Sequence, residues 1–249
     1  QTMALDATVS VDSFTYARFR LQPLRTTLSL ERGALQSRTT ARLNGSTWAF
    51  GLSGRPFDVR PRFRLAEGRF RNVDVGALLG DTTQTSMLNG TLDARLRGAD
   101  PSALQMDVQL GLDTSRVNRA RLQSGTLAAT LDAGTLTAQL DLTTPHGEAH
   151  FAGRAAPFQD RPTFALSEGT VRRLDLAAFA GRPADTTAVS GQLTLTGAGQ
   201  TLGDLTLDAA LALDTTRVNR ATLTDGAFAL TARAGRLALD GDLGMDGGR

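Results

Sequence analysis

The chain has 249 residues, and its 27 basic and 25 acidic side chains leave a formal net charge of +2; every basic residue is an arginine. The two signs of charge are interspersed, which is typical of a solvated surface and predicts no nucleic-acid partner. The absence of cysteine excludes disulfides, thiolate metal sites and cysteine nucleophiles, and no stretch reaches the roughly 20 apolar residues of a membrane-spanning helix.

Period-two alternation of apolar and polar residues predicts that most of the chain forms strands with one apolar face. Glycines such as Gly125, Gly153 and Gly226 are interpreted as turn residues between them. Short connections of this kind favour antiparallel neighbours. The predicted strands, in chain order, cover 3–12, 26–31, 38–44, 47–53, 91–97, 104–113, 126–131, 135–142, 147–153, 192–196, 205–214, 227–232 and 236–243.

Two segments break this alternation, VDVGALLG at 73–80 and LDLAAFAG at 174–181. Apolar residues stand at i, i+3 and i+4 in each, so we predict short amphipathic helices over 73–79 and 174–180. Each helix is expected to pack its apolar stripe across the sheet and close part of a groove mouth or edge. The predicted stripes are Val75, Leu78 and Leu79, and Leu176, Phe179 and Ala180; the predicted N-caps are Asp74 and Asp175, and Gly80 and Gly181 should follow the C-termini.

A nine-residue motif occurs twice, as LDTSRVNRA at 112–120 and as LDTTRVNRA at 213–221. The same offset of 101 residues aligns the flanking sequence without a gap, which indicates tandem structural units. We interpret the motif as the place where a long strand ends, turns and starts the next one. The predicted units form one continuous array, expected to be a piece of a longer repetitive protein: unit 1 over 1–112, unit 2 over 113–213 and the start of unit 3 over 214–249.

One short helix per unit is too little to cover the apolar face of about seven strands. Two sheets could fill the space between them as a sandwich or solenoid, or one long sheet could curl into a trough with an open apolar floor. The predicted fold class is all-β and mainly antiparallel, an elongated U-shaped sheet with a hydrophobic groove. About twenty strands at a spacing of ~4.8 Å would make it roughly 90–100 Å long.

The alternation also predicts which side chains line the groove. The inward-facing set is Leu104, Met106, Val108, Leu110, Leu112, Leu136, Leu140, Leu193, Leu195, Leu205, Leu207, Ala209, Leu211, Leu213, Phe228, Leu230, Leu237 and Leu239.

His146, Glu148 and His150 are the one group that could support an enzyme or a metal site, because their spacing places them on one face of a strand. The corresponding positions of the preceding unit are Gly45, Thr47 and Ala49, which favours a solvated strand instead. We therefore predict no catalytic residues, no metal and no cofactor.

Several segments resemble the AsmA-like and TamB proteins of the diderm bacterial envelope. They are LDLAAFAG at 174–181, GQLTLTG at 191–197, LGDLTLDAALAL at 202–213 and the hairpin at 226–241, with weaker copies at 73–80, 90–98, 101–112 and 125–140. The resemblance implies a taco-shaped β-sheet with a hydrophobic groove, a periplasmic location, and a parent protein anchored in the inner membrane.

The resemblance predicts a non-enzymatic conduit segment that carries phospholipid or another acyl lipid between the two membranes. It also implies an outer-membrane barrel partner, contacted by regions outside this sequence. The alternative is a structural β-solenoid or adhesin stalk, or a scaffold for outer-membrane protein assembly, with a self-filled core. Lipid that co-purifies with the protein would distinguish the conduit from the alternatives.

Overall fold

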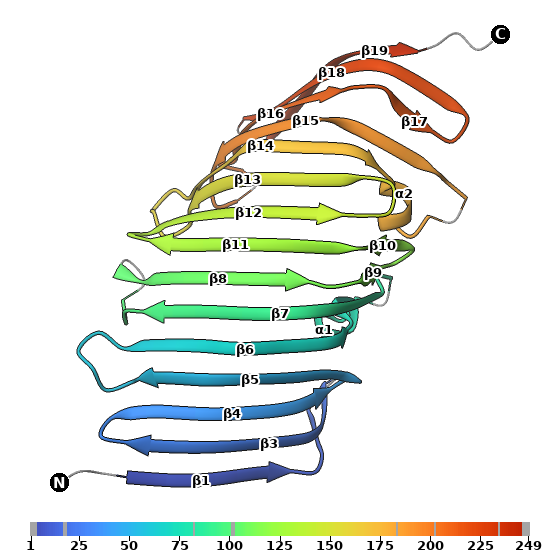
Figure 1. Ribbon diagram of the computed structural model, residues 1–249. Coiled ribbons are helices and arrows are strands. Elements are labelled where there is room, and N and C mark those ends of the chain that lie inside the picture. The colour runs from blue at the N-terminus through green and yellow to red at the C-terminus, as the bar shows by residue number, and fades with distance from the viewer. Residues whose placement is uncertain are drawn as a thin grey trace.

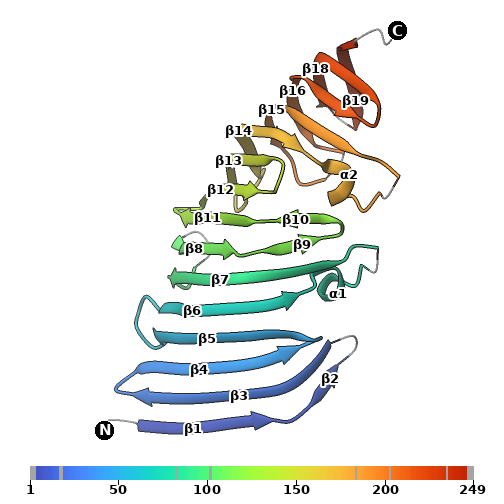
Figure 2. The ribbon, with the colours of Figure 1, turned by 45° about the vertical axis from the view of Figure 1, so that its right-hand side comes forward.

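The protein forms one long antiparallel sheet (Figure 1). The computed structural model describes residues 4–16, 19–81, 83–100, 103–182, 184–201, 203–233 and 235–245. Residues 1–3 of the predicted first unit and 246–249 of the third therefore lie outside the described residues. The strands follow one another along the sheet in chain order, and its two ends are far apart. Turned by 45°, the strands near the C-terminus are rotated against those near the N-terminus, so the sheet twists along its length (Figure 2).

The first half of the sheet contains β1 (Ala4–Val11), β2 (Phe14–Tyr16), β3 (Phe19–Glu31), β4 (Ala34–Leu43), β5 (Ser46–Arg55), β6 (Arg62–Val73), α1 (Val75–Leu79), β7 (Ser86–Arg97), β8 (Gln105–Leu112), β9 (Ser115–Val117) and β10 (Ala120–Leu122). The second half contains β11 (Ser124–Asp132), β12 (Thr135–Thr143), β13 (Glu148–Ala156), β14 (Thr163–Leu174), α2 (Leu176–Phe179), β15 (Thr187–Ala198), β16 (Thr206–Leu213), β17 (Thr216–Val218), β18 (Ala221–Arg233) and β19 (Arg236–Met245).

The all-β, mainly antiparallel fold predicted from the sequence is confirmed, and the sheet is elongated. The accessible surface is 16250 Å², against about 10,600 Å² expected for a compact protein of this mass. The predicted length was too great, however. Of the nineteen strands in the described part of the chain, four (β2, β9, β10 and β17) have three residues each and continue a longer strand. Fifteen strand positions at ~4.8 Å give a sheet about 67 Å long.

Two strands that alternation did not predict, β6 and β14, are interrupted by β-bulges. In β6 the residues on the apolar face are Phe63, Leu65, Gly68, Phe70 and Val73, so the spacing between them alternates between two and three residues. Glu67 and Asn72 adopt positive φ angles of 55° and 56° at the two irregularities. A bulge adds one residue to one strand, and it therefore hides the strand from a search for period two.

The interpretation of the glycines as turn residues was wrong for many of them. Gly125, Gly153 and Gly226 lie inside strands, and only others such as Gly134 belong to hairpin turns. Inside the sheet, a phenylalanine ring often lies over a cross-strand glycine. Phe164 pairs with Gly197, and a Cβ added to that glycine would collide with the ring. Such pairs keep the apolar face continuous where glycine contributes no side chain.

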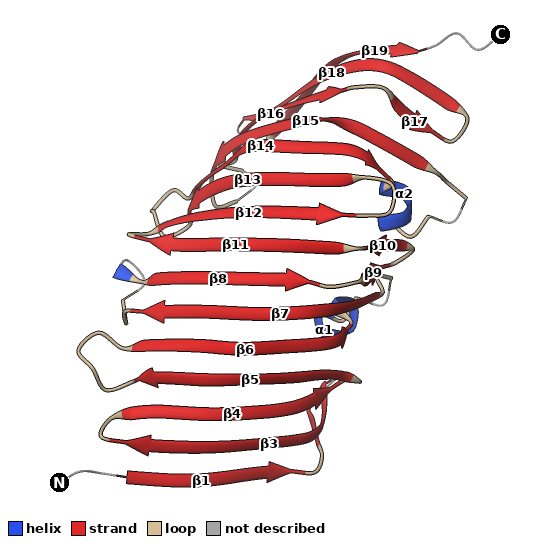
Figure 3. Ribbon diagram, viewed as in Figure 1, coloured by secondary structure: helices blue, strands red, loops and turns tan. Residues whose placement is uncertain are grey.

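Both α-helices lie at the same edge of the sheet (Figure 3). The predicted caps are confirmed: the side chain of Asp74 accepts a hydrogen bond from the backbone of Ala77, and that of Asp175 from Ala178. Gly80 and Gly181 have left-handed φ angles of 78° and 70°.

The predicted apolar stripes are buried only in part, because Leu78 and Phe179 are half-buried and the other members are exposed. Val75 and Leu176 are exposed, and Leu79 is 71% exposed; the buried helical residues are Gly76 and Ala177. Each helix approaches the adjoining chain so closely that only a small residue fits, since a Cβ on Gly76 would collide with the carbonyl oxygen of Gln84. The two helices are therefore short connections between strands, each with one small buried residue.

Most of the fully buried side chains lie at this helix edge, at the ends of the strands. Leu122 is only 2% exposed, and the aromatic rings of Trp48 and Phe70 pack with centroids 5.6 Å apart. The edge therefore contains a small core, whose buried apolar members include Phe70, Val73, Ala120, Leu122, Ala149, Leu174 and Ala177.

The repeated nine-residue motif builds this edge. After β8 the strand breaks at Asp113–Thr114 and resumes as β9, and the buried Ser115 bridges the break. Its hydroxyl accepts a hydrogen bond from the backbone N–H of Asn89 at 3.0 Å and donates one to the carbonyl oxygen of the same residue at 3.4 Å. Thr216 makes the same two bonds with Ser190 in the second copy. The Ser/Thr of the motif thus replaces ladder bonds that the broken strand cannot make.

The asparagine of the motif fixes the next turn. Asn118 has a φ of 50°, in the left-handed region that asparagine tolerates better than most residues. Its side chain accepts a hydrogen bond from the N–H of Thr85 and donates to the carbonyl oxygen of Phe179 at the end of α2. Asn219, with a φ of 54°, accepts the matching bond from Thr186. The motif therefore has a structural role. Its first copy connects the segment after α1 and the end of α2 to the turn that contains Asn118.

Candidate functional site

Strand register gathers the apolar side chains of the sheet on one face, which we call the apolar face. One row crosses five neighbouring strands through Leu92, Leu110, Leu127, Leu140 and Phe151, each opposite the next. Cross-strand partners in an antiparallel pair lie on the same side of the sheet. Rows of this kind continue from β1 to β19. At each β-bulge the apolar residues before and after the bulge remain on the same face of the sheet.

The predicted groove residues of β8, β12, β15, β16, β18 and β19 all belong to the apolar face. Leu104 and Leu205 lie just before β8 and β16, outside the strands in which they were predicted. Leu237 and Leu239, on the last strand, are 74% and 70% exposed. The register adds further apolar residues to this face that were not named in the prediction. They include Leu35, Leu52, Phe63, Leu65, Leu92, Leu96, Leu127, Leu131, Phe151, Phe164 and Leu166.

No second layer covers the apolar face in the described part of the chain. Strands make their main contacts with their ladder neighbours, and the helices with β7 and β15. Met106, Val108, Leu110 and Leu112 are accordingly half-buried, covered only by the neighbouring side chains on the same face. The sandwich or solenoid that sequence reasoning left open is not present among the described residues.

A cavity of about 680 Å³ lies at the strand ends opposite the helix edge. It spans β4 to β8 and β11, and its apolar lining consists of Leu35, Phe63, Leu96, Met106 and Leu131. Five arginines also line it, Arg55, Arg62, Arg64, Arg95 and Arg97, together with Asp107 and Asp132. Its volume lies within the range of roughly 300–1,000 Å³ that is usual for small-molecule sites.

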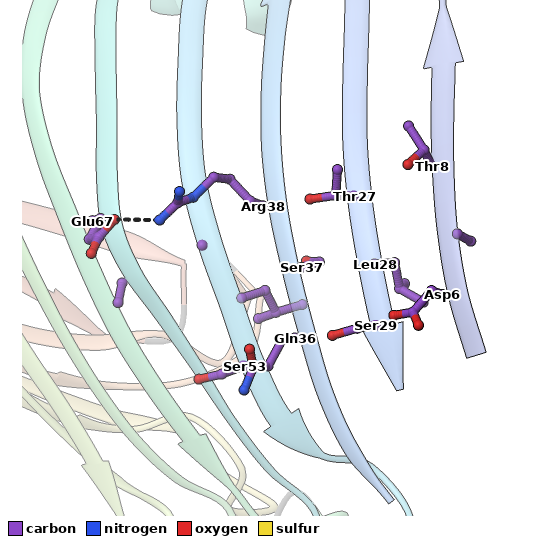
Figure 4. Close-up of a pocket in the computed structure, with 14 residues that line it drawn as sticks. Asp6, Thr8, Thr27, Leu28, Ser29, Gln36, Ser37, Arg38, Ser53 and Glu67 are labelled. Carbon is purple, nitrogen blue, oxygen red and sulfur yellow. Dashed lines mark hydrogen bonds and ion pairs between the residues drawn. The ribbon is translucent and has the colours of Figure 1, made fainter. Parts of the chain in front are cut away.

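A second hollow, of about 710 Å³, lies over β1 and β3 to β6 and is mostly polar (Figure 4). Thr8, Thr27 and Ser29 contribute hydroxyl groups, and Arg38 forms an ion pair with Glu67 at 3.5 Å. Neither histidine of the chain lines this hollow, so its hydroxyls have no imidazole base beside them.

The three residues of the His146 group do not converge. His146 lies in the turn before β13 and not on the strand, while Glu148 forms an ion pair with Arg172 at 3.1 Å. His150 Nδ1 lies 2.5 Å from Asp141 Oδ1, and His150 Nε2 lies 3.8 Å from a Glu168 oxygen. The hydrogen bond with Asp141 raises the pKa of His150 and lowers that of the carboxylate.

Among the described residues, no three histidine or acidic side chains are grouped so that they could hold a metal ion. Over the same residues, no helix is long and apolar enough to cross a membrane. Comparisons of this chain with protein-family models, with curated protein sequences and with solved structures found no match.

Proposed function

We propose that this chain is a non-enzymatic segment of a lipid conduit, in which the apolar face carries acyl chains. The observation that supports the proposal is the continuity of that face across the fifteen strand positions that the structure describes, with no covering layer among the described residues. Exposed apolar patches larger than a few hundred Å² usually mark binding surfaces. A continuous row such as the one through Leu110 and Leu140 provides an apolar path along the sheet.

The resemblance to AsmA-like and TamB proteins adds a cellular setting to the proposal. The setting is the periplasm of a diderm bacterium, with phospholipid as the cargo and a parent protein that spans from the inner membrane towards the outer one. The scaffold with a self-filled core receives less support, because its interior would need a second layer over Leu110 and its neighbours.

The first test is the lipid content of the purified chain. Organic extracts analysed by mass spectrometry should contain acyl lipids in a reproducible ratio to protein. The proposal would be contradicted if the folded protein, with its apolar face intact, were purified from hosts that contain membranes and carried no lipid.

The second test places a charge on the apolar face. Leu110→Asp should abolish the transfer of a fluorescent phospholipid between vesicles, because an unpaired carboxylate among acyl chains costs several kcal/mol. The neighbouring Gln109 points to the opposite face and is exposed, so Gln109→Asp is the matched control and should transfer normally. Circular dichroism should show folded sheet in both variants. Equal transfer by both folded variants would exclude the apolar face as the path.

A further inference from the structure

A hollow of about 380 Å³ in the first repeat unit is lined by three arginines, Arg42, Arg69 and Arg71, which we call the arginine site. Over β4, β5 and β6, the strand register forms two cross-strand rows here: Arg42, Thr47 and Arg71 in one, and Thr40, Ala49 and Arg69 in the other. Both rows lie on the face opposite the apolar face, because they alternate along the strands with residues of the apolar face such as Trp48. Pro23, Ala41 and Trp48 also border the hollow.

The hollow exists because the central strand carries small side chains between long ones. Thr47 and Ala49 lie on β5, and the arginines lie on the strands to either side. Arg42 and Arg71 are two strand spacings apart, roughly 10 Å, with Thr47 between them. All three arginines are exposed. Their guanidinium groups can therefore approach one ligand above Thr47 from both sides.

The positive charge of the arginine site is not neutralised by the described part of the chain. None of its three arginines forms an ion pair there, and no acidic residue lines the hollow. Glu67, which is on β6 with Arg69 and Arg71, pairs with Arg38 at 3.5 Å instead. The site therefore presents three cations to an incoming anion.

The second repeat unit shows what the same position holds when it is neutralised. The residues 101 positions after Arg42, Thr47 and Arg71 are Thr143, Glu148 and Arg172, and they form the same row. There the Glu148 carboxylate forms an ion pair with Arg172 at 3.1 Å. The first unit has a hydroxyl in place of this carboxylate and one more arginine in the row. The same scaffold thus holds an anionic group of its own in one unit and lacks it in the other.

From this comparison we propose that the arginine site binds the phosphate group of a soluble organic phosphate, in the place that the Glu148 carboxylate takes in the second unit. A phosphate ester carries between one and two negative charges more than its alcohol and has three acceptor oxygens, which matches several cations better than a single carboxylate does. A guanidinium group donates two parallel hydrogen bonds to such oxygens, and the Thr47 hydroxyl adds another donor. The ligand is soluble because the site lies on the face opposite the proposed lipid path, and the site is independent of that path.

The test is calorimetric titration of the whole chain, at constant ionic strength, with glycerol 3-phosphate and with glycerate as its carboxylate counterpart. Glycerol 3-phosphate should bind about tenfold more tightly, because it makes additional hydrogen bonds between charged groups. Equal affinity for the two compounds would overturn the assignment to phosphate. If neither compound bound, the arginine site would not be a ligand site.

Two variants locate the binding. Arg42→Gln/Arg71→Gln should lower the affinity for glycerol 3-phosphate about tenfold or more, because it removes charged donors from both sides of the hollow. Thr47→Glu should lower it as well, because the new carboxylate should pair with Arg71 as Glu148 pairs with Arg172. Circular dichroism should show folded sheet, since the second unit already has glutamate at this position. Unchanged affinity in either folded variant would overturn the proposal.

The matched control places the same charge on the same face at a distance. Ala128→Glu introduces a carboxylate at an exposed position of β11, between Gln109 and Gln139 in the ladder. Its affinity for glycerol 3-phosphate should equal that of the wild-type chain. If Ala128→Glu lost as much affinity as Thr47→Glu, the chain would be responding to net charge alone, and the proposal of a specific site would be wrong.

Discussion

The helix edge and the open middle of the apolar face are built from the same strands but are packed very differently. At the edge, Leu122 and Leu174 are fully buried, with 2% and 5% of their surface exposed. In the middle of the face, Leu110 is covered only by its neighbours on one side of a single sheet. The difference indicates that the edge supplies the close packing, whereas the middle of the face is free to hold a ligand.

The largest expected effect comes from truncating a leucine at the edge. Leu122→Ala should destabilise the protein by about 2–5 kcal/mol, because it leaves a cavity in a packed environment. Leu110→Ala should cost only about 1 kcal/mol, since its side chain loses partial burial without leaving an enclosed space. Chemical denaturation of both variants measures the difference. Equal losses would mean that the middle of the face is as closely packed as the edge.

A second comparison concerns the two motif asparagines at the edge. Asn118→Ala should cost about 1–3 kcal/mol, because it loses hydrogen bonds to two segments and puts alanine at a positive φ. Asn219→Ala should cost less, since Asn219 is exposed and its side chain bonds, among the described residues, to the 185–186 segment alone.

Asn118→Gly separates the two causes, because glycine adopts the positive φ without strain but makes no side-chain bonds. Its stability should lie between those of the wild-type chain and Asn118→Ala. If Asn118→Gly were as stable as the wild-type chain, the hydrogen bonds to Thr85 and Phe179 would contribute nothing.

The helix caps should contribute less than the motif. Asp175→Ala removes the acceptor for the N–H groups of Ala178 and Thr187 and should cost about 1 kcal/mol, measured by thermal unfolding. Asp175→Asn keeps an acceptor and should lose only part of this stability. Phospholipid binding should persist in both variants, because α2 lies at the ends of the strands (Figure 3).

The smallest effect should be a pH dependence at the polar face. The hydrogen bond to Asp141, with the nearby Glu168 carboxylate, raises the pKa of His150 above its usual value of 6.5. The protonated histidine therefore stabilises the folded state fully below its unfolded pKa, and this stabilisation is lost as the pH rises through the folded value. Proton NMR titration should show a lower His150 pKa in Asp141→Asn. An unchanged pKa would rule out the pairing in solution.

Much of the architecture follows from the sequence alone, because its signals are local. Alternation as in LQMDVQLGLD specifies a strand with one apolar face, and the offset of 101 residues specifies that the pattern recurs. Asp74 and Asp175 could be identified as caps because a cap bonds to a backbone N–H only three residues away.

Tertiary structure decided everything that depends on contacts between distant residues. The sequence could not reveal that Phe164 covers Gly197, that Gly76 and not Val75 is the buried residue of α1, or that bulges hide β6 from a period-two pattern. Only the strand register shows that Arg64 lies opposite Arg95. The two residues are 31 positions apart in the sequence, and which residues become cross-strand neighbours depends on how the intervening chain folds. Local periodicity determines the element and the side of each residue, and register determines its neighbours.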